Sequence, residues 1–142
     1  MTDIQEYTQA KNKKLIDRYP WLCPERTEDG KVADTYDYTY TELAFVPKGW
    51  EELVIRLCEQ IRNVLLNCDD PDAFKKYRLS EIKEKWGMLC WYDYMFDFSA
   101  VPEEIDRLVK IAERLSTHTC MCCGSHKLPE EYFCESCSKI YR

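Results

Sequence analysis

The sequence predicts an α+β domain in which several helices pack on a small antiparallel sheet, closed by a C-terminal zinc-binding turn with four cysteines. Three observations predict this fold. Apolar residues recur at helical spacing over residues 50–67 and 102–116, an aromatic-rich stretch surrounds Gly87 as in a β-hairpin, and two Cys-x2-Cys pairs lie near the C-terminus. No Gly/Ser-rich linker interrupts the chain, so we expect a core domain over residues 1–117 and a rigidly attached zinc module over residues 118–142.

The N-terminal part predicts one helix and one strand. Residues 3–19 carry an imperfect apolar stripe, follow a capping residue (Thr2 or Asp3) and end at a proline, which is typical of a helix. Prolines, a glycine and charged residues over residues 20–34 indicate a loop. Tyr alternates with Asp and Thr in residues 35–46, which predicts a strand.

The centre of the chain predicts a long helix, a short helix and a hairpin. Residues 50–67 have one broad apolar stripe, the clearest helical pattern in the sequence. Residues 71–76 fit a short helix, followed by a hairpin that pairs residues 77–82 with residues 88–94. A single helix over residues 72–85 is the alternative, because its apolar residues also roughly fit a helical period.

Residues 102–116 predict another helix, because Pro102 and several acidic residues occupy the first turn, where the helix dipole favours negative charge. Six apolar residues form its expected buried face: Ile105, Leu108, Val109, Ile111, Ala112 and Leu115. We expect this helix and the helix over residues 50–67 to supply most of the core.

Four cysteines have the spacing of a zinc site. Cys120 and Cys123 form one Cys-x2-Cys pair, and Cys134 and Cys137 form a second after ten intervening residues. Two such turns supply four soft ligands at tetrahedral corners, which Zn²⁺ favours. Gly124 follows the first pair, as in a zinc knuckle whose turn requires a positive φ. Because four thiolates fill the coordination shell, we expect one structural zinc ion and no catalytic one.

Three neighbouring residues leave the ligand set partly open. Cys122 has the wrong spacing for either pair, so we exclude it. His118 or His126 could replace one cysteine, since imidazole nitrogen also binds zinc. The four cysteines could alternatively be buried thiols, although two pairs this close together argue against that interpretation.

Composition restricts the class of protein. The chain has 26 acidic and 20 basic residues, a net charge of −6 and no basic segment, which disfavours nucleic-acid binding because Lys and Arg contacts with phosphate provide most of its affinity. We find no secretory signal and no apolar run of membrane-spanning length, and the nine cysteines suit a reducing compartment. We therefore expect a cytoplasmic protein without membrane contacts.

The sequence predicts no enzymatic activity. It contains no phosphate-binding loop, nucleophile elbow or zinc-protease motif. A catalytic cysteine needs a nearby base, and both histidines flank the cysteine cluster.

Two groups of aromatic residues are candidate binding surfaces. Tyr36, Tyr38 and Tyr40 lie on one side of the predicted strand and could contact a protein partner, since Tyr is frequent at interfaces. A second group beside Gly87 could line an aromatic pocket: Trp86, Trp91, Tyr92 and Tyr94. Packing against the core is the competing interpretation for both groups.

Four short motifs point to a family. They are Lys83-Glu84-Lys85-Trp86-Gly87 followed by Leu89, Trp91 and Tyr92; Pro47-x-Gly49-Trp50; the helix end from Glu113 to Ser116 before Cys-x2-Cys-Gly; and Tyr38-x-Tyr40-Thr41-Glu42-Leu43. With them, the chain from about residue 15 onward resembles a family of small, largely uncharacterised proteins encoded by bacteriophages and prophages. The resemblance implies a bacterial host cell, the order helix–hairpin–helix and a zinc-binding tail. It implies no catalytic residues, and Cys90 stands where the family has a basic residue.

Together these observations predict a non-enzymatic, zinc-binding, phage-type accessory protein that binds a protein partner, such as a host or defence factor, and could inhibit it. An acidic protein suits a partner with a basic surface. One alternative is a nucleic-acid-associated, zinc-ribbon-like module, although residues 118–142 have no net positive charge. Another is a protein that sequesters a small nucleotide signal by stacking aromatic side chains on its base.

Overall fold

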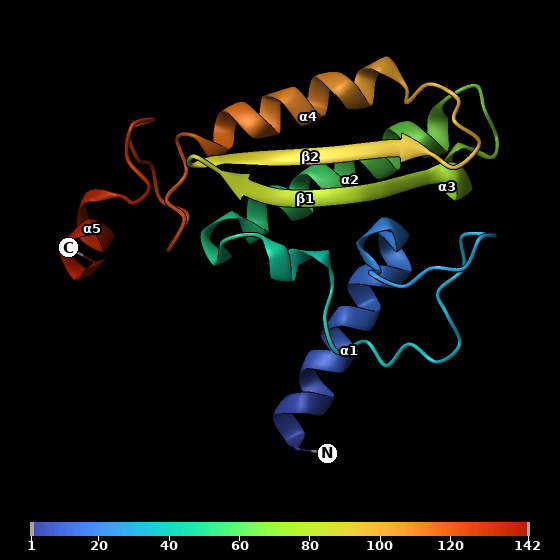
Figure 1. Ribbon diagram of the computed structural model, residues 1–142, viewed down its shortest axis with the longest axis horizontal. Helices are drawn as coiled ribbons and strands as arrows, with labels where there is room; N and C mark the ends of the chain where they lie inside the picture. Colours follow the sequence, from blue (N-terminus) through green and yellow to red (C-terminus); the bar gives the residue numbers. More distant parts are fainter. Residues whose placement is uncertain (1, 142) are drawn as a thin grey trace.

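The computed structural model describes residues 2–141 and has an α+β fold, as the sequence predicts (Figure 1). Its longer helices are α1 (Asp3–Arg18), α2 (Glu51–Asn67) and α4 (Glu103–Ser116), and its strands are β1 (Tyr77–Lys85) and β2 (Met88–Met95). The shorter helices are α3 (Ala73–Lys76) and α5 (Glu135–Tyr141), with 3-10 turns η1 (Pro20–Leu22), η2 (Glu42–Phe45) and η3 (Lys48–Trp50). None of the helices in this described range has the length and apolar composition needed to cross a membrane.

The two strands form the predicted antiparallel hairpin, with Ile82 opposite Trp91. Both turn residues, Trp86 and Gly87, have positive φ angles, of 55° and 80°, as the tightest hairpin turns require. The Glu84 carboxylate accepts a hydrogen bond from the Gly87 backbone N–H at 2.9 Å and fixes this turn. The alternative of a single helix over residues 72–85 is therefore wrong, whereas the short helix before the hairpin is confirmed as α3.

The core lies between α2, α4, the hairpin and the segment after α1. Both predicted long helices are confirmed, and α4 packs against α2 and β2. Several of the largest buried side chains come from elsewhere, however, including Trp21, Trp50 and Tyr77. The predicted buried face of α4 is too broad, because Ile111 and Leu115 are half exposed. The residues of α4 that are buried form a narrower stripe: Ile105, Val109, Ala112 and Ser116.

Residues 35–46 contain no strand, so that prediction is wrong. Tyr38 has a φ of 59°, in the left-handed region, and the Asp37 carboxylate accepts a hydrogen bond from the Thr39 backbone N–H at 3.2 Å. These two features accompany a bend of the chain at Thr39. The segment then enters η2, which the Thr41 hydroxyl caps by accepting from the Leu43 N–H.

Helix α1 is held to the body at its C-terminal end. Thr2 and Gln5 form a capping box at its start, which confirms one of the two predicted caps. The helix then extends away from the body (Figure 1) and buries only Ile16. At its last turn, the Arg18 guanidinium pairs with the Glu59 carboxylate of α2.

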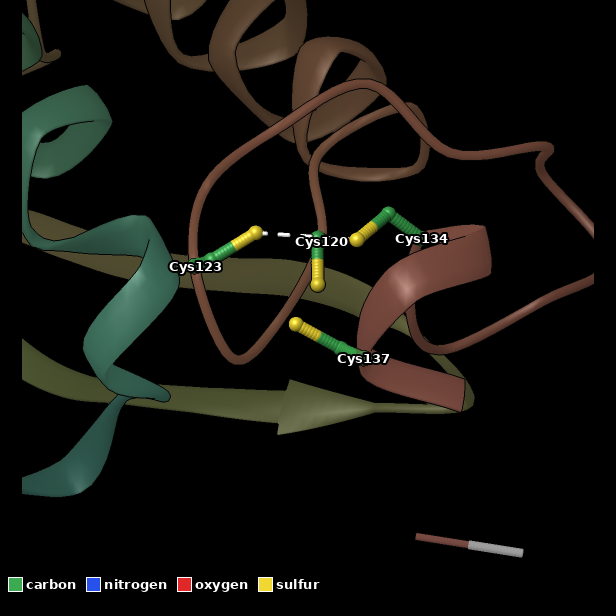
Figure 2. A group of neighbouring side chains, drawn as sticks. All are labelled: Cys120, Cys123, Cys134 and Cys137. Carbon is green, nitrogen blue, oxygen red and sulfur yellow. Dashed lines mark hydrogen bonds between the residues drawn. The ribbon is translucent and has the colours of Figure 1, made fainter. Parts of the chain in front are cut away.

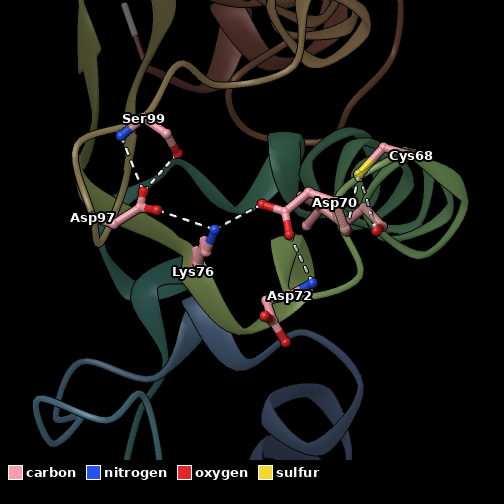
Figure 3. Close-up of polar contacts among 7 residues, drawn as sticks. Cys68, Asp70, Asp72, Lys76, Asp97 and Ser99 are labelled. Atoms are coloured by element: carbon pink, nitrogen blue, oxygen red, sulfur yellow. Dashed lines mark hydrogen bonds and ion pairs between the residues drawn. The ribbon is translucent and has the colours of Figure 1, made fainter.

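An ion-pair network joins the two loops at the open end of the hairpin (Figure 3). Lys76 Nζ lies 2.8 Å from an oxygen of Asp70, which follows α2, and 3.0 Å from an oxygen of Asp97, which follows β2. Ser99 donates hydrogen bonds to Asp97 from its backbone and its hydroxyl. Lys76 therefore fixes two segments that are distant in sequence.

Candidate metal centre

The structure brings the four predicted ligands together (Figure 2). The sulfur atoms of Cys120, Cys123, Cys134 and Cys137 all lie within 4.8 Å of one another. The sulfurs of Cys123 and Cys134 are 3.6 Å apart. Tetrahedral zinc with bonds of about 2.3 Å requires sulfur–sulfur distances of roughly 3.8 Å. The donor set and its spacing thus fit one metal ion.

Two local structures hold the sulfur atoms in place. Cys120 and Cys123 lie in the turn after α4, where the Gly124 N–H donates to the Cys120 carbonyl at 3.0 Å and Gly124 has a φ of 83°. Cys134 and Cys137 lie at the start of α5, as Figure 2 shows. Helix α5 was not expected from the sequence. It places its two cysteines one turn apart, facing the first pair.

Hydrogen bonds favour the ionised form of the first pair. Burial raises the pKa of Cys120, but backbone N–H donors from Cys123, Cys134 and Cys122 outweigh it and lower the pKa to about 6. Hydrogen bonds from Ser125 lower the pKa of Cys123. In contrast, burial and hydrogen bonds to the neighbouring sulfurs raise the pKa of Cys137. The centre holds four negative charges only when a cation neutralises them.

The metal-binding turn packs directly on the start of α2. The Gly49 backbone N–H donates to the Met121 carbonyl at 3.0 Å, and the Trp50 Nε1–H donates to the Thr119 carbonyl at 2.9 Å. A Cβ atom on Gly49 would lie 2.1 Å from the Cys120 carbonyl oxygen, so only glycine allows this approach. These contacts join the turn to the core, whereas the division into two domains at residue 117 stays a prediction.

The other residues near the predicted site lie outside the ligand group. The part of the chain that the structure describes has one group of cysteines able to hold a metal, and Cys122, His118 and His126 do not belong to it. The two histidine rings stack on each other, with centroids 5.9 Å apart. The geometry therefore favours four sulfur ligands over a set with one histidine.

The rings of the three tyrosines that were expected to form one binding face lie together, with the Tyr36 centroid 6.4 Å from that of Tyr40, but their exposure differs. Tyr36 is buried and stacks on Tyr38, with ring centroids 5.2 Å apart. Tyr40 is 42% exposed. Without a strand in this segment, the three side chains do not share a strand face, and Tyr36 follows the core-packing interpretation. A role of Tyr38 and Tyr40 in partner binding stays a prediction.

The aromatic residues beside Gly87 are partly buried in the core and partly exposed on the surface. Trp91 is buried and donates its Nε1–H to the Tyr77 hydroxyl at 2.9 Å, so it belongs to the core. Trp86 is 82% exposed at the tip of the hairpin. Tyr92 and Tyr94 are exposed on β2. The four residues therefore do not line one pocket.

Three of the four sequence motifs meet around the metal-binding turn. The Pro47-x-Gly49-Trp50 motif supplies the two contacts with Met121 and Thr119. The turn of the hairpin lies against the same region, since a Cβ on Gly87 would touch the ring of Tyr132 at 3.0 Å. Sequence reasoning missed Gly49 and Trp50 as residues that position this turn, although the motif had singled them out.

No protein-family model matches the sequence, and no solved structure matches the fold. The resemblance to phage and prophage proteins therefore stays a prediction from the motifs.

Proposed function

We propose that the protein binds one structural zinc ion and acts by binding a protein partner rather than by catalysis. The four-sulfur group is the observation that carries the proposal. Four thiolates in tetrahedral arrangement favour zinc among the common cellular divalent ions, and they leave no coordination position for a reacting water. The ion would fasten residues 118–141 to the start of α2 and to the hairpin.

The tip of the hairpin is the partner-binding surface in this proposal. Trp86 is 82% exposed and held at a φ of 55°, a conformation that costs energy for a bulky side chain. Met88 and Tyr132 are partly exposed in the same region, since Met88 follows Gly87 in the chain and the Tyr132 ring lies beside Gly87. Trp, Tyr and Met are enriched in protein interfaces, and Trp most often provides large binding energies. This supports a partner with an apolar pocket.

Metal content tests the first part of the proposal. The purified protein should contain one zinc ion per chain by elemental analysis and native mass spectrometry. Cys120→Ser and Cys134→Ser should lose the ion, whereas Cys122→Ser should keep it, because Cys122 lies outside the ligand group. A folded protein without metal, or one that contains iron instead, would contradict zinc binding.

Affinity capture from bacterial lysate, with quantitative mass spectrometry, tests the second part. Trp86→Ala should lose the captured partner and keep the zinc. Phe98→Ala is the matched control, because Phe98 is 89% exposed and has a φ of 60° but lies at the other end of the hairpin. Equal recovery of the same protein by both variants would contradict a role for the hairpin tip.

A further inference from the structure

Two arginines lie side by side near the start of β1, at the end of the hairpin opposite the Gly87 turn. Arg26 comes from the loop after η1 and Arg78 from β1. Each donates a hydrogen bond from Nη1 to the same acceptor, the Tyr77 carbonyl, at 3.2 Å. Their Nη2 atoms both lie within 3.2 Å of the position that a Cβ on Gly30 would occupy. The two positive charges are therefore in close proximity.

No carboxylate of the described residues forms a direct ion pair with either arginine, although the more distant Asp29 charge slightly favours the charged form of Arg78. Among residues 2–141, no acidic side chain lies within ion-pair distance of Arg26 or Arg78. Arg78 is only 7% exposed, and burial lowers its pKa. Burial, with a smaller contribution from the Arg78 charge, lowers the pKa of Arg26 to about 10. Two neighbouring, partly desolvated cations without an ion-pair partner are unfavourable, so the fold maintains a charge that an anion would stabilise.

Part of the hydrogen-bonding capacity also remains unused. Arg78 donates from Nη1 to the Lys75 and Tyr77 carbonyls, while its Nε and Nη2 have no acceptor among the described residues. Arg26 donates from Nε and Nη2 to the Gly30 carbonyl. These contacts fix the orientation of both guanidinium groups before any ligand binds, which lowers the entropy cost of binding.

The arginines open into a cavity of about 340 Å³. Two hydroxyl-bearing residues, Thr27 and Ser80, and two aromatic residues, Tyr94 and Phe96, are among those that line it. The Phe96 ring centroid is 5.1 Å from the Arg78 guanidinium carbon. Two acidic residues, Glu28 and Glu42, also line the cavity but pair with neither arginine. The volume is in the range of small-ligand sites.

We propose that Arg26 and Arg78 bind the phosphate group of a small phosphorylated ligand in this cavity. Guanidinium groups bind phosphate oxygens through two parallel hydrogen bonds, and two arginines match the charge of a phosphate monoester. The rings of Tyr94 and Phe96 provide a surface for a planar group such as a nucleobase. The site is independent of the metal centre and of the hairpin tip.

Calorimetry and thermal shift on the full chain test this site with three probes: inorganic phosphate, adenosine 5′-monophosphate and adenosine. Both phosphate-containing probes should bind and raise the melting temperature, whereas adenosine should not. Tighter binding of the nucleotide than of phosphate would support a ring contact. No binding of either phosphate probe at millimolar concentration would overturn the proposal.

Variants distinguish this site from general attraction of anions. Arg26→Gln should weaken nucleotide binding at least tenfold, while Lys31→Gln, the same charge change on an exposed residue of the same loop, should not. Arg78→Lys, which keeps the charge but removes the paired donors, should also weaken nucleotide binding. This variant tests the site if Arg26→Gln does not fold. Equal affinity of the arginine variants and the parent would overturn the site. An RNA oligonucleotide that binds where the mononucleotide does not would overturn the small-ligand assignment.

Discussion

The Ser116 hydroxyl accepts a hydrogen bond from the Leu89 backbone N–H at 2.8 Å and thereby joins the last turn of α4 to the edge of β2 that does not face β1. One turn earlier, the Glu113 carboxylate accepts from the Trp91 N–H at 3.0 Å. Residues two apart in a strand and three apart in a helix point the same way, so the two bonds form together. Side chains of α4 thus accept the hydrogen bonds of backbone N–H groups on this edge of β2, which could otherwise pair with a strand of another chain.

Replacement of Ser116 by alanine should destabilise the protein. The buried N–H of Leu89 loses its acceptor, which costs about 1–3 kcal/mol in the free energy of unfolding. Urea denaturation followed by tryptophan fluorescence measures this loss. The neighbouring Thr117→Ala, whose hydroxyl bonds only to the Arg114 carbonyl of its own helix, should cost less than about 0.5 kcal/mol. Equal losses would show that the contact with β2 is unimportant.

Replacement of Gly49 by alanine should loosen the metal-binding turn. The added methyl group would lie 2.1 Å from the Cys120 carbonyl oxygen, so the turn must move away from α2. We expect a loss of roughly 1–3 kcal/mol and faster transfer of zinc to a chromogenic chelator. Lys48→Ala, in the same 3-10 turn but exposed, is the control. Unchanged zinc release from Gly49→Ala would mean that the turn does not depend on this close approach.

Replacement of Lys76 by methionine should release the two loops that it joins. Both ion pairs, with Asp70 and Asp97, disappear, and the two carboxylates lose their shared cation. The melting temperature should fall by a small amount, and the difference from the parent should shrink as salt is added. Lys75→Met removes the same charge from a side chain without an ion pair and should leave the melting temperature unchanged. Hydrogen exchange in residues 96–101 gives a second readout, because only Lys76→Met should speed it.

Acid should weaken the contact between α1 and α2. A hydrogen bond from Arg18, with a second from Tyr19, lowers the pKa of Glu59 to about 2. A carboxyl with a lowered pKa in the folded state stabilises the fold above its unfolded pKa of roughly 4.3 and loses this contribution as pH falls towards 2. In denaturation curves across this range, Glu59→Gln should therefore lose less stability than the parent. Arg18→Gln should likewise reduce the dependence of the free energy of unfolding on pH in this range. If both variants lost as much stability as the parent, the Arg18–Glu59 contact would not be the cause.

The elements that were predicted correctly are those set by patterns within a short stretch of sequence. Helices α2 and α4 each carry an apolar stripe that needs one neighbouring surface, and the two Cys-x2-Cys pairs fix their own turns. The hairpin followed from Gly87 and its flanking residues. In these cases the interactions that set the structure lie close together in the chain.

The errors arose where local side-chain bonds or distant contacts decide the structure. Alternating tyrosines predicted a strand over residues 35–46, but the Asp37 carboxylate bonds to the backbone two residues on and turns the chain. Helix α5 has too few residues for a recognisable period. The pairing of Arg26 with Arg78 depends on the loop after η1 folding over β1, which no spacing in the sequence indicates.

The contact between Gly49 and Met121 joins a segment that is made early during synthesis to one that is made late. A ribosome makes the start of α2 well before it makes the two cysteine pairs, so on the nascent chain this surface stays uncovered while the hairpin and α4 emerge. Only after Cys137 has left the exit tunnel are all four sulfurs present to capture an ion. The availability of zinc at that moment would then govern how long freshly made chains remain vulnerable to proteases.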